Sequence, residues 1–339
     1  MSLFNKHFCC IILVSSLLFD IYSLQFGNGN DESSTEFIQV ATDVKDFYLD
    51  DFNTSYIIKN DGSLWGTGEL VYNDFFCQST KINTFEKIEE NVTYFDGLYL
   101  IKNDSSVYRV LQGLQKFEFD IEKGAGPFFI TKNKELWVYG NNDNGSFGTG
   151  LFNVNYEYPI KVMNNVKDVC YSNLYSLVIT SDNELLISGT HYLPLPFKRT
   201  NKFVKLADNV RVVTENFFIT KNDELYAFGW CAHGITGLGD LDKTYGILPT
   251  KVMDNVKNVV SNGHATLILK NDGKVFGCGG DSPNYCGELG FGNYEPVFTP
   301  TYIMENVTKI DIATTYSAIL KNDGTLWMCG ENSEWGAGL

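Results

Sequence analysis

Leu267-Ile268-Leu269-Lys270-Asn271-Asp272-Gly273-Lys274-Val275-Phe276-Gly277 is the stretch that decides the fold, because close copies of it recur along the chain. A clear second copy contains Lys321-Asn322-Asp323-Gly324 between apolar flanks. Asn, Asp and Gly tolerate the positive φ angles of a tight turn, and the apolar and aromatic flanks suit two paired strands. Each copy is therefore expected to form a β-hairpin.

The first turn residue of this phrase can be followed to the C-terminal end at seven positions: Lys59, Lys102, Lys132, Ser181, Lys221, Lys270 and Lys321. Successive spacings are 43, 30, 49, 40, 49 and 51 residues, with a mean of about 44. A strand-rich repeat of this length is typical of one propeller blade. We therefore predict an all-β fold, a seven-bladed β-propeller.

Composition and charge agree with a globular protein and exclude some partners. The 339 residues are 44% hydrophobic and 14% aromatic, which is ample for a core. The net charge of −15 repels phosphate backbones and anionic membranes, so we expect no nucleic-acid partner. The basic cluster of Lys198, Arg199, Lys202 and Lys205 is interpreted as a solvated loop.

The N-terminal segment resembles a signal peptide. A weakly basic start is followed by an apolar run at residues 8–19, which is too short to cross a bilayer but suits a signal core. We expect a signal peptide at 1–23, a polar linker at 24–36 and the propeller at 37–339, in a secreted or cell-surface protein with no membrane insertion after cleavage. An uncleaved anchor or a buried strand is the alternative.

The two ends of the repeat region complete one another. The chain stops after Trp327 and a Gly-rich stretch, without the outer strand that follows in other repeats, such as the one beginning at Pro300. The missing strand resembles residues 37–41 at the other end. Pairing that N-terminal strand into the last blade would remove two open sheet edges. We predict this closure and expect a monomer.

Two repeats depart from the pattern. The third unit spans only 30 residues, with Leu111-Gln112-Gly113-Leu114 in place of the long Gly-rich loop. One blade is therefore expected to lack its loop, which would leave a notch in the loop face. The unit at Ser181 carries residues 191–197 (His-Tyr-Leu-Pro-Leu-Pro-Phe) instead of the Gly pattern.

The stretch from Gly263 to Gly279, followed by Cys286-Gly287-Glu288-Leu289-Gly290, resembles the repeat of the regulator of chromosome condensation family. Weaker matches occur at residues 141–148 and 234–239. The resemblance implies a seven-bladed propeller whose first and last strands share a blade. Founding members of the family exchange guanine nucleotide on the small GTPase Ran, and secreted bacterial relatives bind another protein through aromatic loops. The signal-like start and acidic charge favour the second situation.

Motifs for catalysis or metal binding are missing from the sequence. The four histidines are His7, His191, His233 and His264, and the two in variable loops, His191 and His233, have no nearby His-x-His or Cys-x-x-Cys partner. Gly-x-Ser-x-Gly and the phosphate-binding Gly-x-x-x-x-Gly-Lys-Ser/Thr do not occur. We therefore expect no catalytic residues, no metal and no cofactor, and interpret the protein as a non-enzyme.

Six cysteines lie beyond the signal-like segment. Cys278 and Cys329 stand at equivalent strand positions, which indicates buried apolar fillers. Cys231 and Cys286 fall in equivalent loops of successive repeats and form a candidate disulfide.

The strongest functional feature is a set of large aromatic residues in or beside the variable loops, because rigid aromatics above a stiff scaffold supply binding hot spots. The candidate partner-binding residues are Phe75, Phe76, Phe147, Tyr192, Phe197, Trp230, Tyr285 and Trp335. Our hypothesis is a secreted or surface-displayed module that binds an unknown protein partner through one face. The alternatives are an exchange factor or regulator of a small GTPase, a propeller enzyme that acts on polysaccharide, and a structural module of a surface layer.

Overall fold

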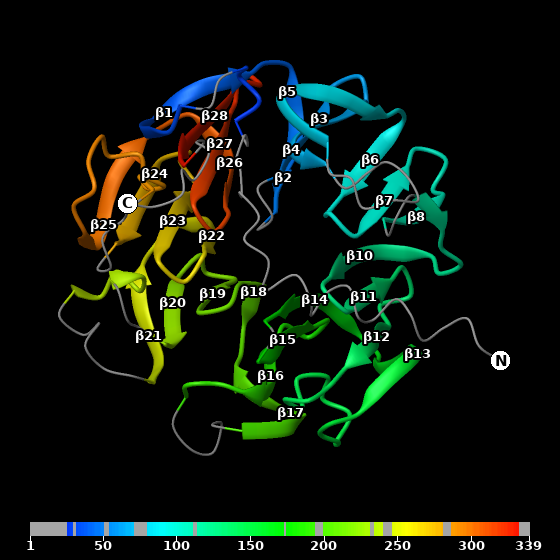
Figure 1. Ribbon diagram of the computed structural model, residues 1–339. Helices are drawn as coiled ribbons and strands as arrows, with labels where there is room; N and C mark the ends of the chain where they lie inside the picture. The colour runs from blue at the N-terminus through cyan, green and yellow to red at the C-terminus, as the bar shows by residue number, and fades with distance from the viewer. Residues whose placement is uncertain are drawn as a thin grey trace, which may run out of the picture.

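The computed structural model shows seven four-stranded antiparallel sheets arranged in a ring (Figure 1). It describes residues 26–29, 32–50, 54–70, 80–110, 114–172, 174–193, 199–230, 234–239, 246–280 and 286–331. The predicted all-β, seven-bladed propeller is confirmed. Within the described residues, no helix is long and apolar enough to span a membrane.

We call the sheets blades A to G in chain order. Blade A contains β2 (Val44–Leu49), β3 (Thr54–Lys59), β4 (Leu64–Leu70) and β5 (Thr80–Glu89), and blade B contains β6 (Val92–Phe95), β7 (Tyr99–Lys102), β8 (Val107–Val110) and β9 (Leu114–Lys116). Blade C contains β10 (Ile121–Ala125), β11 (Phe128–Thr131), β12 (Leu136–Asn141) and β13 (Asn155–Met163). Blade D contains β14 (Val166–Tyr171), β15 (Tyr175–Thr180), β16 (Leu185–Thr190) and β17 (Arg199–Ala207).

The remaining blades follow the same plan. Blade E contains β18 (Val210–Val213), β19 (Phe217–Thr220), β20 (Leu225–Gly229) and β21 (Ile247–Met253), and blade F contains β22 (Val256–Ser261), β23 (Ala265–Lys270), β24 (Val275–Gly279) and β25 (Val297–Met304). Blade G combines β26 (Val307–Ile312), β27 (Tyr316–Lys321) and β28 (Leu326–Gly330) with the N-terminal strand β1 (Ser34–Ala41).

The hydrophobic core lies in the seams between neighbouring blades. The second strand of a blade is nearly continuous in apolar residues because both of its faces are covered, as in β23, where five consecutive residues are buried. The seam between blades E and F shows the packing: Phe217, Ile219 and Leu225 of one blade meet Val256 and Val259 of the next. The ring is therefore held by contacts between sheets.

The Lys-Asn-Asp phrase forms the hairpin between the second and third strand, as predicted. In each blade one residue of this turn has a positive φ: Gly62, Ser105, Lys134, Asn183, Asp223, Gly273 and Gly324. The lysine at the start of the phrase also has a role, since the ammonium of Lys321 lies 4.2 Å from the ring centroid of Trp327. The phrase thus combines turn geometry with a surface contact.

The same hairpin joins one blade to the next. The backbone N–H of Val92 donates to the carbonyl of Gly62 over 2.8 Å, and the N–H of Val44 donates to that of Gly324 over 3.0 Å. The second bond joins blade G to blade A. The seam between blades B and C departs from this pattern, because the N–H of Ile121 donates instead to Phe119, over 3.1 Å.

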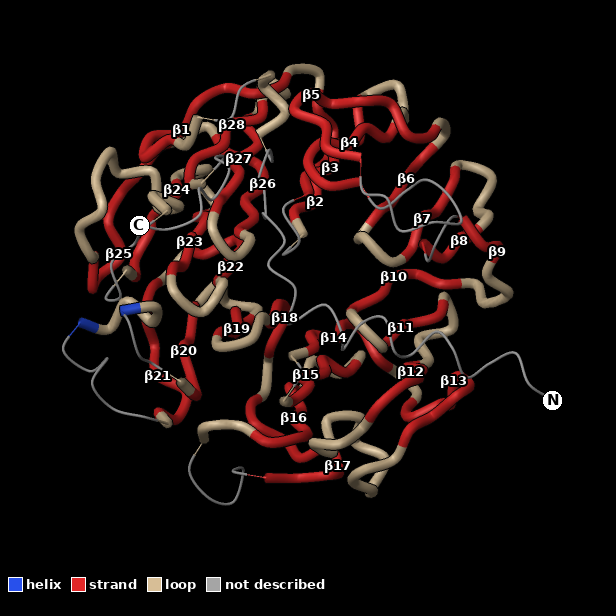
Figure 2. Tube along the Cα trace, in the orientation of Figure 1, coloured by secondary structure: helices blue, strands red, loops and turns tan. Residues whose placement is uncertain are grey.

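The predicted closure of the ring is confirmed. Strand β1 pairs antiparallel with β28, and Gln39 lies opposite Trp327. In Figures 1 and 2, β1 lies at the outer side of the sheet that contains β28, β27 and β26. The strand begins at Ser34, three residues before the predicted boundary at 37.

Part of the predicted linker at 24–36 belongs to the folded ring, and this corrects the prediction. Phe26 is fully buried among apolar residues of blades A and G. The N–H of Gly29 donates to the carbonyl of Asn83 over 2.8 Å, and Asn28 forms a β-bridge with Thr84. The polar composition of 27–36 indicated a solvated linker, but a backbone hydrogen bond and a β-bridge hold Asn28 and Gly29 on β5.

The connection between the third and fourth strands is short in blade B, as expected from its 30-residue unit. Strands β8 and β9 are separated by residues 111–113 alone, whereas residues 142–154 separate β12 from β13. The long loop is therefore missing from blade B. The predicted signal at 1–23 lies outside the described residues.

Candidate functional site

Two kinds of connection share one face of the ring. Because successive strands of a blade are antiparallel, the turn after the first strand and the loop after the third strand leave the sheet on the same side. We call this side the loop face. The Lys-Asn-Asp hairpins and the turns between blades lie on the opposite side. Variable loops above a regular scaffold are where binding residues are usually found.

Among the predicted partner-binding aromatics, Tyr192 and Trp230 remain candidates on the loop face. Tyr192 is 45% exposed, and its ring contacts that of half-buried Trp230 edge to face at a centroid distance of 4.8 Å. This pair joins the loops of blades D and E. The other predicted residues outside the described ranges are Phe75, Phe76, Phe197, Tyr285 and Trp335.

Phe147 was wrongly predicted as a contact residue, because its side chain is completely buried. Its ring packs against Phe128 and Tyr156. The N–H of Phe147 donates to the side-chain oxygen of Asn142 over 2.9 Å, which holds the loop folded back over the seam between blades C and D. The aromatic residue of a Gly-rich loop therefore serves the core.

His191 lies beside the pair of Tyr192 and Trp230 but is almost buried, with 6% exposed. Its Nδ1 accepts a hydrogen bond from the N–H of Leu193 over 3.3 Å, and its ring meets Tyr175 edge to face. Burial lowers the pKa of His191 to about 4, so the ring is neutral at neutral pH. The side chain therefore supports the loop.

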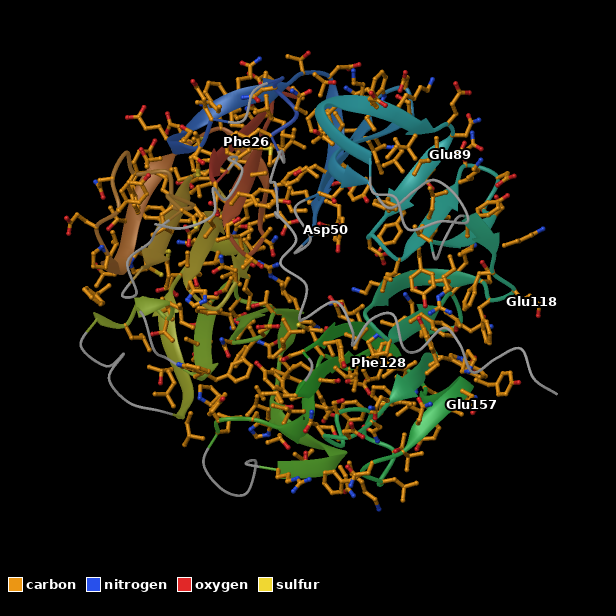
Figure 3. All side chains as sticks on the ribbon, viewed as in Figure 1. Phe26, Asp50, Glu89, Glu118, Phe128 and Glu157 are labelled. Atoms are coloured by element: carbon orange, nitrogen blue, oxygen red, sulfur yellow. The ribbon has the colours of Figure 1, made fainter. Side chains whose placement is uncertain are left out.

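The loop face also contains a hollow of about 410 Å³ near the axis of the ring. It is lined by turns after the first strands of three successive blades, A, B and C. The lining residues are Tyr48, Asp50, Asp96, Gly97, Leu98, Gly124, Ala125 and Gly126. Figure 3 shows Asp50 on the inner side of the ring, and Glu157 by contrast on the outer side.

Two carboxylates give the hollow an acidic lining held in fixed positions. Asp96 accepts hydrogen bonds from the N–H groups of Leu98 and Tyr99, at 3.0 and 2.7 Å, and from the hydroxyl of Tyr94 at 2.8 Å. Burial raises the pKa of Asp96, although these bonds act in the opposite direction. Asp50 accepts the N–H of Thr54 over 2.9 Å.

Other charges near the axis are neutralised within the inner strands. Lys309 lies 2.5 Å from a carboxylate oxygen of Asp46, and Lys123 forms an ion pair with Asp168. These pairs join first strands of neighbouring blades: β26 to β2 and β10 to β14.

Among the described ranges, no group of His, Cys, Asp and Glu has the geometry to hold a metal ion. Cys278 and Cys329 are buried free thiols, as predicted. The Sγ of Cys286 lies 3.7 Å from Oε2 of Glu331. Cys231 lies outside the described residues, so the disulfide of Cys231 with Cys286 stays a prediction.

Sequence reasoning missed both acids of the hollow. Each follows a short apolar strand, as in Phe95-Asp96-Gly97, and this resembles an ordinary turn. Their proximity depends on the curvature of the ring, which no local pattern contains.

Comparison with known proteins supports the architecture over most of the chain. The yeast RCC1 in its complex with Kap60 superimposes with a TM-score of 0.65 at 14% identity, over 85% of this chain and 80% of that one. Human WBSCR16 gives 0.63 at 14% identity, over 87% and 88%. The fold is that of an RCC1-like seven-bladed propeller. A further structure, yeast Prp20p, is described with its binding to Gsp1p and histones, and gives 0.62 at 14% identity over 85% and 82%.

Similarity in sequence reaches a smaller part of this RCC1-like chain. It is 33% identical over 130 residues to the X-linked retinitis pigmentosa GTPase regulator of Canis lupus familiaris, and 32% identical over 130 residues to that of Homo sapiens. Each match covers 36% of this chain and 12% of the relative's length. No family model matches the chain.

Proposed function

We propose that this propeller is a protein-binding regulator that engages a small GTPase on its loop face, with the hollow between blades A and C at the centre of the contact. The observation that carries the proposal is the concave hollow of about 410 Å³, lined by two carboxylates and formed by the turns of three blades. Its lining by Asp50 and Asp96 favours a basic group of the partner. The 130 residues that resemble a GTPase regulator support the class of partner.

The interface is expected to extend from the hollow to the exposed side of Tyr192. A standard interface buries ~800 Å² on each partner, and this area is larger than the surface that lines the hollow. Aromatic anchors near acidic groups would add affinity, while the carboxylates would raise the rate of encounter with a basic surface.

The test uses Ran loaded with a fluorescent GDP analogue. Addition of the propeller is expected to speed the release of this nucleotide, and Asp50→Lys is expected to weaken the effect at least about tenfold. Glu157→Lys is the matched control, because it makes the same charge change on the outer strand β13, away from the hollow. If neither binding nor release is observed, or if both variants act alike, Ran is not the partner of this surface.

We also propose, as a second candidate, a secreted module that binds another protein through the same face. The apolar run at residues 8–19 supports this alternative. Phe26 is seated in the ring only three residues beyond the predicted cleavage point at Ser23, so cleavage there would leave the contact of Phe26 in place. The mass and the location of the protein isolated from its own host separate the two candidates.

A further inference from the structure

Residues 26–29 (Phe-Gly-Asn-Gly) lie on blade A in the same way that Gly-rich loops lie on other blades. The loop of blade C places residues 147–150 (Phe-Gly-Thr-Gly) on blade D, where Gly150 and Asn201 exchange two hydrogen bonds of 2.6 and 2.7 Å. Gly29 and Asn83 exchange the same two bonds, at 2.8 and 3.3 Å. The residue between the two glycines forms a β-bridge in both cases.

Close packing of the first glycine is also shared. A Cβ on Gly27 would lie 2.6 Å from the ring of Phe85, and a Cβ on Gly148 would lie 2.3 Å from the ring of Phe203. Both glycines have positive φ, +65° and +68°. The apolar residues that precede them, Phe26 and Phe147, are fully buried. The contact therefore selects an apolar residue followed by Gly-x-Gly.

One feature separates the N-terminal segment from the internal loops. Residues 147–150 belong to the loop that follows the third strand of blade C, β12, and residues 289–292 belong to the loop that follows the third strand of blade F, β24. Residues 26–29 instead precede β1, the fourth strand of blade G. The third strand of that blade, β28, ends at Gly330, far away in sequence. The segment is thus connected along the chain to β1 and not to a third strand.

The blades without such a Gly-x-Gly contact show how the site can be closed. In three blades that carry such a segment, the third strand has a small residue at the position beneath it: Thr67 in blade A, Ser188 in blade D and Cys329 in blade G. Blade B has only a three-residue connection between its third and fourth strands, and the next blade, C, has Tyr139 at this position. Blade D lacks the Gly pattern, and the next blade, E, has Phe228 there. A large aromatic residue there takes the place of a seated segment.

We propose that blade A contains a peptide-binding site for an apolar-Gly-x-Gly segment, which residues 26–29 occupy within the chain and which a second segment of the same kind occupies when the N-terminal segment leaves. The partner is an extended peptide with an aromatic residue before the first glycine. Phe85 and Thr67 select the glycine by excluding a Cβ, and Asn83 binds the second glycine through its main chain and side chain. The site is independent of the proposed hollow, which lies near the axis.

Competition within the chain decides when the site is open. A segment tethered beside its site has an effective concentration on the order of millimolar, so a free peptide competes poorly with it. Gly27→Val removes the competitor, because the new side chain meets the ring of Phe85 and needs a strained positive φ. The full-length Gly27→Val chain is therefore the form that exposes the site.

The experiment titrates a fluorescent peptide with the sequence of residues 24–31 against the full-length wild-type and Gly27→Val chains and follows anisotropy. We expect the Gly27→Val chain to bind the peptide at least tenfold more tightly than the wild type. A peptide with Val in place of its first Gly is expected not to bind. Thr67→Phe, added to Gly27→Val, is expected to abolish binding because it imitates Phe228. Equal binding by wild-type and Gly27→Val chains would overturn the proposal.

A second measurement covers the case in which Gly27→Val does not fold. Phe26→Ala keeps the backbone glycine and removes the buried ring. Added peptide is expected to raise the melting temperature of the Phe26→Ala chain by several degrees, and the peptide with Val in place of Gly is expected to have no effect. A melting temperature that does not respond to the first peptide would contradict the proposed site.

Discussion

The N–H of Val44 donates to the carbonyl of Gly324 over 3.0 Å, which joins the first strand of blade A to the last hairpin of blade G. The bond depends on the positive φ of Gly324, +80°. At the equivalent hairpin position Ser105, Lys134, Asn183 and Asp223 adopt φ between 61° and 66°. The position therefore needs a left-handed backbone but admits a side chain.

Gly324→Val is expected to destabilise the ring by about 1–3 kcal/mol, because a β-branched residue is strained at positive φ. Gly324→Asn is expected to change the free energy of unfolding by less than about 0.5 kcal/mol, since Asn183 occupies the same place in blade D. Urea unfolding of both variants checks the prediction. Equal losses in the two variants would show that the seam cannot accept any side chain there.

Phe147 and Tyr192 are two aromatic residues of loops whose substitution by Ala is expected to change the folding free energy by very different amounts. Phe147→Ala removes a fully buried ring and is expected to cost about 3–5 kcal/mol of folding free energy. Tyr192→Ala removes a half-exposed ring and is expected to cost less than about 1 kcal/mol. Thermal or urea unfolding distinguishes them. A small loss at Phe147 would mean that its loop does not hold the seam between blades C and D.

The blade pattern could be predicted from the sequence because its signals are local. Asn-Asp-Gly fixes a hairpin within four residues, and the apolar flanks fix two strands. Closure by β1 could also be predicted, since a strand missing at one end was present at the other and open edges are unfavourable. These arguments require no knowledge of which side chains meet across a seam.

The contacts of residues 26–29 and the acidic hollow could not be predicted in this way. Phe26 is buried because Phe85 and blade G cover it, and these partners lie far away in sequence. The polar residues after it favoured a solvated linker. Asp50 and Asp96 line one hollow because neighbouring blades curve around one axis, which is a property of the closed ring. Phe147 was misassigned because Gly-rich loops can fold inward.

His191 predicts a loss of stability on the acidic side of neutrality. Its folded pKa is lowered by burial to about 4 from an ordinary value of 6.5. The unfolded chain therefore binds a proton first as the pH falls, and stability decreases from pH 6.5 toward pH 4, by up to about 3 kcal/mol. His191→Gln is expected to make the pH dependence shallower in this window. Parallel curves for variant and wild type, measured by urea unfolding, would contradict the assignment.

For Glu288 we expect the opposite dependence of folding stability on pH. It is 4% exposed, its burial raises its pKa to about 7, and the nearby charge of Glu331 acts in the same direction. Below pH 4.5 the carboxyl is protonated in both states, whereas between pH 4.5 and 7 the unfolded chain loses the proton first. Glu288 therefore lowers stability as the pH rises through this window, by up to about 3 kcal/mol at pH 8.

Glu288→Gln is expected to remove this loss, so the variant should gain stability over the wild type at pH 8 and show little gain at pH 4.5. Urea unfolding at the two pH values measures the difference. Glu331→Gln is a suitable comparison, because it removes only the neighbouring charge and should recover a smaller part of the stability. The backbone carbonyl of Glu288 still accepts the hydroxyl of Ser317 in both variants, so the loop stays seated on blade G. An equal effect of Glu288→Gln at both pH values would mean that the buried carboxyl does not titrate in this range.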